Sequence, residues 1–346
     1  MPRAMPRAIP RALRRVATFC AALLLAVTGL VPAARADCQG VNLIDSLPEA
    51  ERRALFDAAD AVPYPRGNFW RATRGEDVLH IIGTYHLDDP RHSATMARIT
   101  PLIDSAATVL VEGGPEEEAA LLAALARDPS LMVITDGPTL RESLTDLEWD
   151  LLADAMRERG LPPFMVSKFR PWYVSMLLAF PACDMDSVQQ GLGGLDGLVI
   201  ARAEAGDIPI RALEPYDTVF GMFEQMSLAD QLGMIRSSLA MEPRAADYSV
   251  TLADAYFDGE SRVIWELTRA LSHDLPGQTP EQVDRDFARM EQALMTNRNR
   301  AWIPVIEGAL QDGPVFAAFG ALHLPGDEGV LNLLDQAGFT LERLPL

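Results

Sequence analysis

Two of the five histidines in this 346-residue chain lie in the same short motif, Gly-x-x-His-Leu. His86 lies in LHIIGTYHLDDP and His323 in AAFGALHLPGD, so each copy follows an apolar run and precedes an acidic loop with a proline. Glycine lets the backbone leave a strand where a Cβ would clash, and three residues later an imidazole can point into the space beyond the strand. The repeat predicts that both imidazoles belong to one site.

Two glutamates stand in comparable places, because Glu112 ends the run ATVLVE and Glu214 ends IPIRALE. In an open α/β sheet, ligands bind in the crevice beyond the carboxyl ends of the strands. Two neutral imidazoles and a carboxylate bind a divalent first-row metal and leave coordination positions open. Such a metal lowers the pKa of bound water and polarises a carbonyl, as amide hydrolysis requires. His86, Glu112 and His323 are therefore the predicted metal ligands.

These residues need strands that end at one edge of a sheet. Short, apolar, β-branched runs between turn residues are typical of buried strands, whereas apolar spacings of three and four are typical of helices. Residues 68–83 fit a hairpin, 92–106 a helix and 107–114 a strand, which is the βαβ pattern of a parallel sheet. Later strands are expected over residues 208–215, 314–320 and 339–344.

The fold class that follows is α/β, with a mixed, largely parallel central sheet flanked by helices. Residues 218–310 consist almost entirely of helical patterns, so they are expected to form a mainly helical insertion or cap over the sheet.

The N-terminus has the form of a signal peptide. Five arginines precede an apolar run over residues 16–31, and Ala34-Arg35-Ala36 has the small-x-small form of a signal-peptidase site. We expect cleavage after Ala36, which makes residues 1–36 the signal and residues 37–66 an N-terminal tail. The alternative is an uncleaved N-terminal membrane anchor, although the run is shorter than the roughly 20 residues that span a bilayer. No stable membrane span is expected after cleavage.

The net charge and the cysteine content limit which partners and which cellular compartment are expected. The formal net charge is −19, and removal of six arginines with the signal gives −25, from 24 basic and 49 acidic residues. Phosphate would repel a chain this acidic, so nucleic acid is not an expected partner. Cys38 and Cys183 are the two thiols left after cleavage. In an oxidising compartment they suggest one disulfide, and two unpaired thiols are the alternative.

Longer stretches occur in order along the chain: GTYHLDDPR, VLVEGG, KFRPWYVSMLL, GGLDGLVIARAEAGDIPIRALEP, NRNRAWIP and AFGALHLPGDEGVLNLL. Together they resemble the TraB/GumN family, which is related to the Tiki metalloproteases and more distantly to erythromycin esterase-like and ChaN-like proteins. The resemblance covers residues 67–346, so this range is the expected family domain.

The resemblance implies that His86 and His323 are the family's paired histidines and that Glu112 is its acidic residue. Supporting roles in the active site are implied for residues in other family motifs, namely Arg170, Glu214 and Asn299. Because Tiki members are described as dependent on divalent metal, Mn, Co or Zn is the expected cofactor. A peptide or small molecule is the expected substrate, and the periplasm is the expected location.

The leading hypothesis is therefore an exported, metal-dependent hydrolase of peptidase or amidase type. A metal-free hydrolase of erythromycin esterase type is one alternative, with His86 as general base beside Glu112 or Glu214. The other is a non-catalytic regulatory protein that captures a peptide or small ligand in the same crevice, with residues 218–310 as its recognition surface. The sequence leaves the oligomeric state open.

Overall fold

The computed structural model describes residues 38–185, 193–275 and 279–346. Contacts group residues 37–346 into one compact unit. The predicted signal peptide, residues 1–36, lies outside the described residues. Among the described residues, no helix combines the length and the apolar character needed to cross a membrane.

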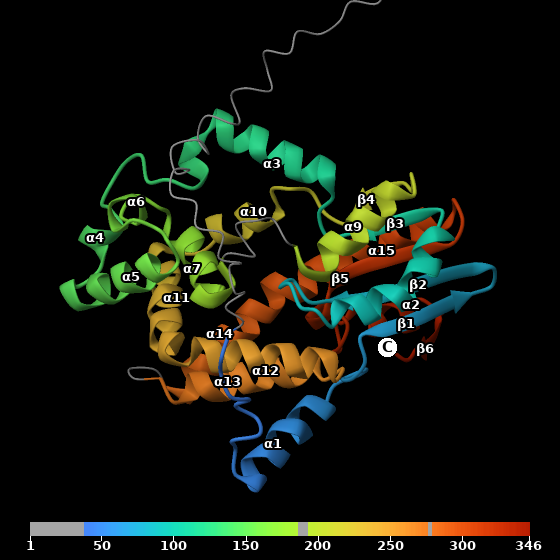
Figure 1. Cartoon of the computed structure of the whole chain (residues 1–346), viewed down its shortest axis with the longest axis horizontal. Coiled ribbons are helices and arrows are strands. Elements are labelled where there is room, and N and C mark those ends of the chain that lie inside the picture. Colours follow the sequence, from blue (N-terminus) through green and yellow to red (C-terminus); the bar gives the residue numbers. More distant parts are fainter. Residues whose placement is uncertain (1–37, 186–192, 276–278) are drawn as a thin grey trace, which may run out of the picture. The chain divides into compact units, whose positions relative to one another are not determined.

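A six-stranded sheet carries the fold, in the spatial order β4-β3-β5-β2-β1-β6 (Figure 1). β4, β3, β5 and β2 run parallel to one another, whereas β1 is antiparallel to both β2 and β6. The predicted mixed, largely parallel α/β sheet is confirmed. The strands are β1 (Phe69–Arg74), β2 (Asp77–Thr84), β3 (Thr108–Val111), β4 (Ile210–Ala212), β5 (Val315–Gly320) and β6 (Thr340–Arg343).

Helices cover both faces of the sheet, which explains why the central strands are apolar throughout rather than alternating. Every residue of β5 is buried: Phe319 packs into the core on one face and Phe316 into the core on the other. The first face is covered by α15 (Asn297–Leu310) and α16 (Val330–Gln336), and the second by α2 (His92–Asp104) and α9 (Gly194–Ala205).

Most of the remaining helices form cores of their own beside the sheet, whereas α12 (Ala245–Phe257) also contributes Ala253 and Tyr256 to the core on the second face. One of these cores joins α5 (Asp146–Glu158), α7 (Pro171–Ala179) and α11 (Leu228–Met241) through Leu152, Val174 and Ile235. Residues 218–310 are mainly helical in the described part, but α15, the last helix of this range, packs on the sheet. The helices are α3 (Pro115–Arg127), α4 (Leu140–Ser143), α5 (Asp146–Glu158), α6 (Pro163–Val166), α7 (Pro171–Ala179), α10 (Thr218–Glu224), α11 (Leu228–Met241), α12 (Ala245–Phe257), α13 (Ser261–His273) and α14 (Pro280–Glu291).

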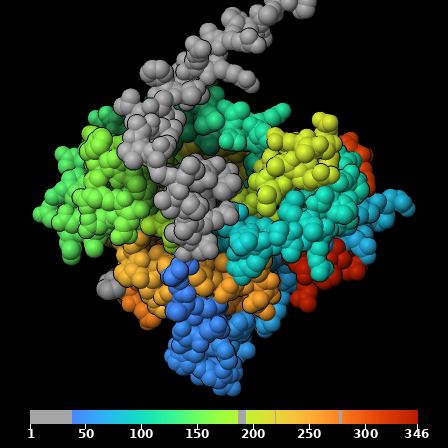
Figure 2. Space-filling model, in the orientation of Figure 1, coloured from blue at the N-terminus to red at the C-terminus, as the bar shows by residue number. Residues whose placement is uncertain are grey.

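The N-terminal segment is tied to this helical part. The disulfide predicted between Cys38 and Cys183 is present, with the two Cα atoms 5.3 Å apart. Leu43 donates its backbone N–H to Thr251 of α12 at 2.8 Å. α1 (Glu49–Asp60) then packs against α13, and the residues from 38 to 60 lie beside the helices of residues 245–273 (Figure 2).

Candidate active site

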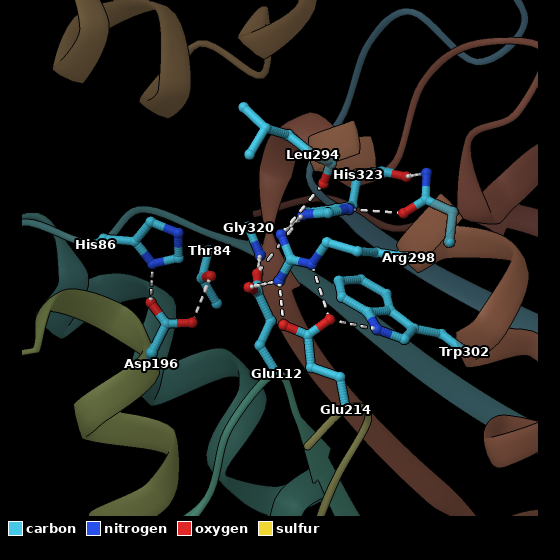
Figure 3. A network of polar contacts seen from close by, with 11 residues as sticks. Thr84, His86, Glu112, Asp196, Glu214, Leu294, Arg298, Trp302, Gly320 and His323 are labelled. Carbon is cyan, nitrogen blue, oxygen red and sulfur yellow. Dashed lines mark hydrogen bonds and ion pairs between the residues drawn. The ribbon is translucent and has the colours of Figure 1, made fainter. Parts of the chain in front are cut away.

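The carboxyl ends of four parallel strands lie at one edge of the sheet, and each is followed within three residues by a predicted site residue. These residues are His86 after β2, Glu112 after β3, Glu214 after β4 and His323 after β5. Their side chains belong to two sets of polar contacts, one around His86 and one around Glu112, Glu214 and His323 (Figure 3).

The two Gly-x-x-His motifs follow neighbouring strands. β2 and β5 pair in parallel, with Gly83 opposite Phe319. A Cβ on Gly83 would lie 2.6 Å from Leu324 Cδ1 and 2.9 Å from Ala321 Cα. The loop of the second motif therefore crosses directly over the glycine of the first.

Gly320, the glycine of the second motif, faces the site instead. A Cβ there would lie 3.1 Å from His86 Nε2 and 3.2 Å from Glu112 Oε1. Neither Gly83 nor Gly320 has a positive φ angle, so other amino acids could adopt the backbone conformation at both positions. Both positions need glycine for close approach: Gly83 lets two loops meet, and Gly320 leaves space between two polar side chains.

Arg298, on the first turn of α15, joins the carboxylates of β3 and β4. Its guanidinium donates to Glu112 Oε2 at 2.6 Å and to both oxygens of Glu214 at 2.7 Å. Glu214 also accepts from Trp302 Nε1 at 3.1 Å, one turn further along α15. The arginine side chain is 11% exposed, so these charged groups are paired in a largely dry setting.

His323 is held in one orientation and one tautomer. Its Nδ1 lies 2.6 Å from Asn299 Oδ1, and Asn299 Nδ2 donates to Glu328 O at 2.8 Å. Because an amide oxygen can only accept, Nδ1 of His323 carries the proton and Nε2 has the free lone pair. That Nε2 lies 3.2 Å from Arg298 Nη1 and 3.9 Å from Glu112 Oε1. Burial lowers the pKa of His323 to about 3, so the imidazole is neutral at pH 7.

His86 has a carboxylate partner, and its side chain is far more exposed to solvent than that of His323. Its Nδ1 lies 2.7 Å from Asp196 Oδ2, and Thr84 Oγ1 donates to Asp196 Oδ1 at 2.6 Å. The side chain of His86 is 57% exposed. Desolvation opposes its charged form, but the Asp196 carboxylate outweighs this and raises the pKa of His86 to about 9.

The start of α9 brings Asp196 to this place. Gly194 has φ 55°, and a Cβ there would lie 2.3 Å from Tyr85 O. Leu195 N donates to the same oxygen at 3.0 Å. The glycine thus lets the first turn of α9 sit against the backbone of the first motif, which sets Asp196 beside His86.

Glu112 is ionised although its carboxylate is largely buried. Burial opposes ionisation, whereas charge interactions with His323, His86 and Arg298 and the Gly320 N–H lower the pKa of Glu112 to about 2. Since His323 is neutral at pH 7, Arg298 and His86 provide the positive charge there. The Gly320 N–H donates to Glu112 Oε1 at 2.7 Å.

A comparison with protein families matches residues 68–343 to the TraB/PrgY/gumN family. This range includes both Gly-x-x-His motifs and all six strands. The chain belongs to the TraB/PrgY/gumN family. A search of curated proteins finds no match.

The donor types at this site of the TraB/PrgY/gumN protein, two imidazoles and a carboxylate, are ones that a divalent metal binds. Each imidazole has Nδ1 engaged by an oxygen acceptor, as metal-binding histidines usually do, which leaves Nε2 for coordination. Gly320 leaves room between His86 Nε2 and Glu112 Oε1, and His323 Nε2 lies 3.9 Å from that same oxygen. His86, Glu112 and His323 are the residues that would hold the ion.

The spacing of these donors is wider than a coordination shell. Within the described ranges, Cys38, Cys183 and Asp184 form the one group of three potential ligands whose donor atoms all lie within 4.8 Å of one another. The two sulfurs of that group are bonded to each other. A metal in the crevice would therefore require the three side chains to move toward one another.

The structure brings together most of the predicted site residues of this family member. Glu214 contacts Glu112 and His323 through Arg298, and Asn299 binds His323 directly. Asn299 is 1% exposed, so it lies inside the protein and not on a solvated face of α15. Arg170 differs, because it is exposed at the start of α7 and its guanidinium donates to Ser130 O. A catalytic role for Arg170 stays a prediction.

Three further residues of the site were not predicted, namely Arg298, Asp196 and Trp302. All three lie in the stretches NRNRAWIP and GGLDG that carry the family resemblance. Their positions in the sequence could have identified them as site residues: Arg298 directly precedes Asn299, and Trp302 follows Arg298 by one helical turn. Asp196 stands three residues after the first of two adjacent glycines, at a helix start.

Proposed function

We propose that this crevice hydrolyses amide-type bonds in a peptide or small-molecule substrate, with a divalent metal ion held by His86, Glu112 and His323. The observation that carries the proposal is the hydrogen bonding that the two imidazoles share, although His86 must first lose the proton on Nε2. In each, Nδ1 is bound to a side-chain oxygen, so Nε2 is left as the ligand atom beside Glu112. Manganese, cobalt and zinc suit such a mixed nitrogen and oxygen set.

When bound, the metal supplies an activated water and polarises the substrate carbonyl. The chain's own residues orient the ligands: Asp196 fixes His86, and Asn299 fixes His323. Arg298 holds Glu112 in place and has Glu214 as its second carboxylate partner. Gly320 keeps the space between His86 and Glu112 free for the ion. The Cys38–Cys183 disulfide supports action in an oxidising compartment, and we propose export to the periplasm.

The test measures metal content by elemental analysis on residues 37–346 after incubation with manganese, cobalt or zinc. Wild type is compared with the His86→Ala/His323→Ala double variant and with His273→Ala, a control histidine that lies outside the crevice and contacts Asp284. We expect about one equivalent of metal in wild type and in the control, and none in the double variant. The same samples are then given a peptide library, and cleavage should follow metal content. A folded double variant that still cleaves would refute the proposal.

Arg298 favours a second candidate, a metal-free hydrolase. A guanidinium already donates to Glu112 and contacts His323, so a positive charge is present without any ion. His86, with Asp196 behind it, would then act as general base once deprotonated. Cleavage that survives exhaustive chelation would support this candidate over the metal-dependent one.

A further inference from the structure

Arg298 has no N–H group left for a substrate. A guanidinium has five N–H donors, and those of Arg298 all have partners. Nε donates to Glu214, Nη2 to Glu214 and Glu112, and Nη1 to Leu294 O and His323 Nε2, the last two at 3.2 Å. An arginine that binds a substrate carboxylate needs a free edge, so Arg298 is a positioning residue within the network.

Two of these partners are also proposed ligands of the metal. His323 Nε2 has a single lone pair, because Nδ1 carries the proton that Asn299 accepts. That lone pair can accept from Arg298 or coordinate a cation, but it cannot do both. Glu112 is shared less strictly: one oxygen accepts from Arg298 and the other from Gly320 N, and each carboxylate oxygen has a second lone pair.

Arg298 keeps good partners if it gives up these two. Its bonds to the two oxygens of Glu214 form a fork that does not involve a proposed ligand. The guanidinium carbon also lies 5.0 Å from the ring centre of Trp302, which itself donates to Glu214. A cation–π contact and a bidentate bond to a carboxylate are two of the stronger interactions that an arginine makes.

We propose that Arg298 is a resident cation that competes with the metal for Glu112 and His323. Without metal it neutralises the carboxylates and occupies the lone pair of His323. When metal binds, the arginine releases these two residues and keeps Glu214. This inference rests on the proposed metal site and adds a regulation to it: metal affinity is set by the ease with which Arg298 withdraws.

The experiment measures Mn²⁺ affinity by calorimetry on residues 37–346, together with the rise in melting temperature at saturating Mn²⁺. Arg298→Met removes the cation and keeps an unbranched side chain. We expect Mn²⁺ to bind this variant about tenfold or more tightly than wild type, because a like charge beside the proposed ligands is gone and His323 and Glu112 are freed. The metal-induced rise in melting temperature should also be larger.

A second variant guards against failure to fold, since Arg298→Met leaves Glu214 without its cation. Arg298→Met/Glu214→Gln removes one positive and one negative charge, so the net charge of the cluster is unchanged while Glu112 and His323 are still freed. Arg300→Met is the matched control, because Arg300 lies on the same helix, is 60% exposed and binds Glu328. Its affinity for Mn²⁺ should equal that of wild type.

The outcomes separate the two proposals. Wild type that binds Mn²⁺, with tighter binding in the double variant, supports both. Wild type that binds no Mn²⁺, with binding in the double variant, supports competition and refutes a metal in the native enzyme. Equal or weaker binding in the folded double variant overturns the competition. Absence of binding in all of them overturns both proposals.

Discussion

The two Gly-x-x-His segments have the same sequence pattern and follow neighbouring strands, yet they create opposite environments. His323 has a side chain that is 6% exposed, is neutral and is bound to an amide. His86 is 57% exposed and bound to a carboxylate that favours its charged form. The difference arises from the partner that each loop meets, α15 for His323 and α9 for His86. One motif therefore provides a fixed imidazole inside the protein, and the other provides an imidazole that solvent can reach.

The largest expected effect is on stability, and it should separate the two histidines. His323→Ala removes a buried ring that lies 4.4 Å from Trp302 and leaves Asn299 Oδ1 without its donor. We expect it to lower the free energy of unfolding by about 2–4 kcal/mol. His86→Ala, at an exposed position, should cost about 0.5 kcal/mol or less. Urea denaturation of both variants checks this, and equal losses would contradict the contrast.

Substitutions of the two glycines should also differ in the loss of stability that urea denaturation measures, and this difference should be smaller than that between the two histidines. Gly83→Ala places a methyl group within 2.9 Å of the Ala321 backbone, which cannot move freely, so a loss of about 1–3 kcal/mol is expected. Gly320→Ala meets the ends of two side chains instead, His86 and Glu112. It should fold with a loss of about 1 kcal/mol or less but bind Mn²⁺ poorly. Normal Mn²⁺ binding by Gly320→Ala would show that the space beside this glycine is not the metal site.

The smallest effect is on the pH dependence of stability in the metal-free protein. The pKa of His86 is raised to about 9, so its contribution is present below the unfolded value near 6.5 and is lost as pH rises through 9. The pKa of His323 is lowered to about 3, so its contribution is present above 6.5 and is lost as pH falls toward 3. Solvent screening at the exposed His86 reduces the first effect.

Histidine signals followed by NMR from pH 3 to 10 test this directly. The His86 signal should move near pH 9, and the His323 signal should stay that of a neutral ring until about pH 3. His86→Ala and His323→Ala assign the two signals. Two histidines that titrate together near pH 6.5 would show that the two loops do not differ as described.

The sequence was sufficient for the strands and for the residues that follow them. Apolar runs such as PVFAAFG can be buried on both faces only in a covered sheet, and the polar residue after each run must then lie at the edge. The disulfide between Cys38 and Cys183 was also predictable, because they are the two cysteines that remain if the expected signal peptide is removed. These features depend on local patterns and on counting.

The partners of the predicted residues could not be obtained in the same way. Arg298 is one of 30 basic residues, and its helix is separated from Glu112 by 186 positions. Only the packing of α15 on the sheet turns Arg298, Asn299 and Trp302 toward the strand ends. The same holds for Asp196, which reaches His86 because Gly194 lets α9 start against the backbone of Tyr85.

The amino-acid sequence by itself thus determined which residues stand at the edge of the sheet, since strand periodicity and the glycine motif are local properties. Tertiary structure decided the protonation state and the hydrogen-bond partners of those residues. Burial and the nearest charge set the pKa of an imidazole, and both depend on helices that are distant in sequence. That is why two copies of one motif became one neutral, enclosed histidine and one exposed histidine beside a carboxylate.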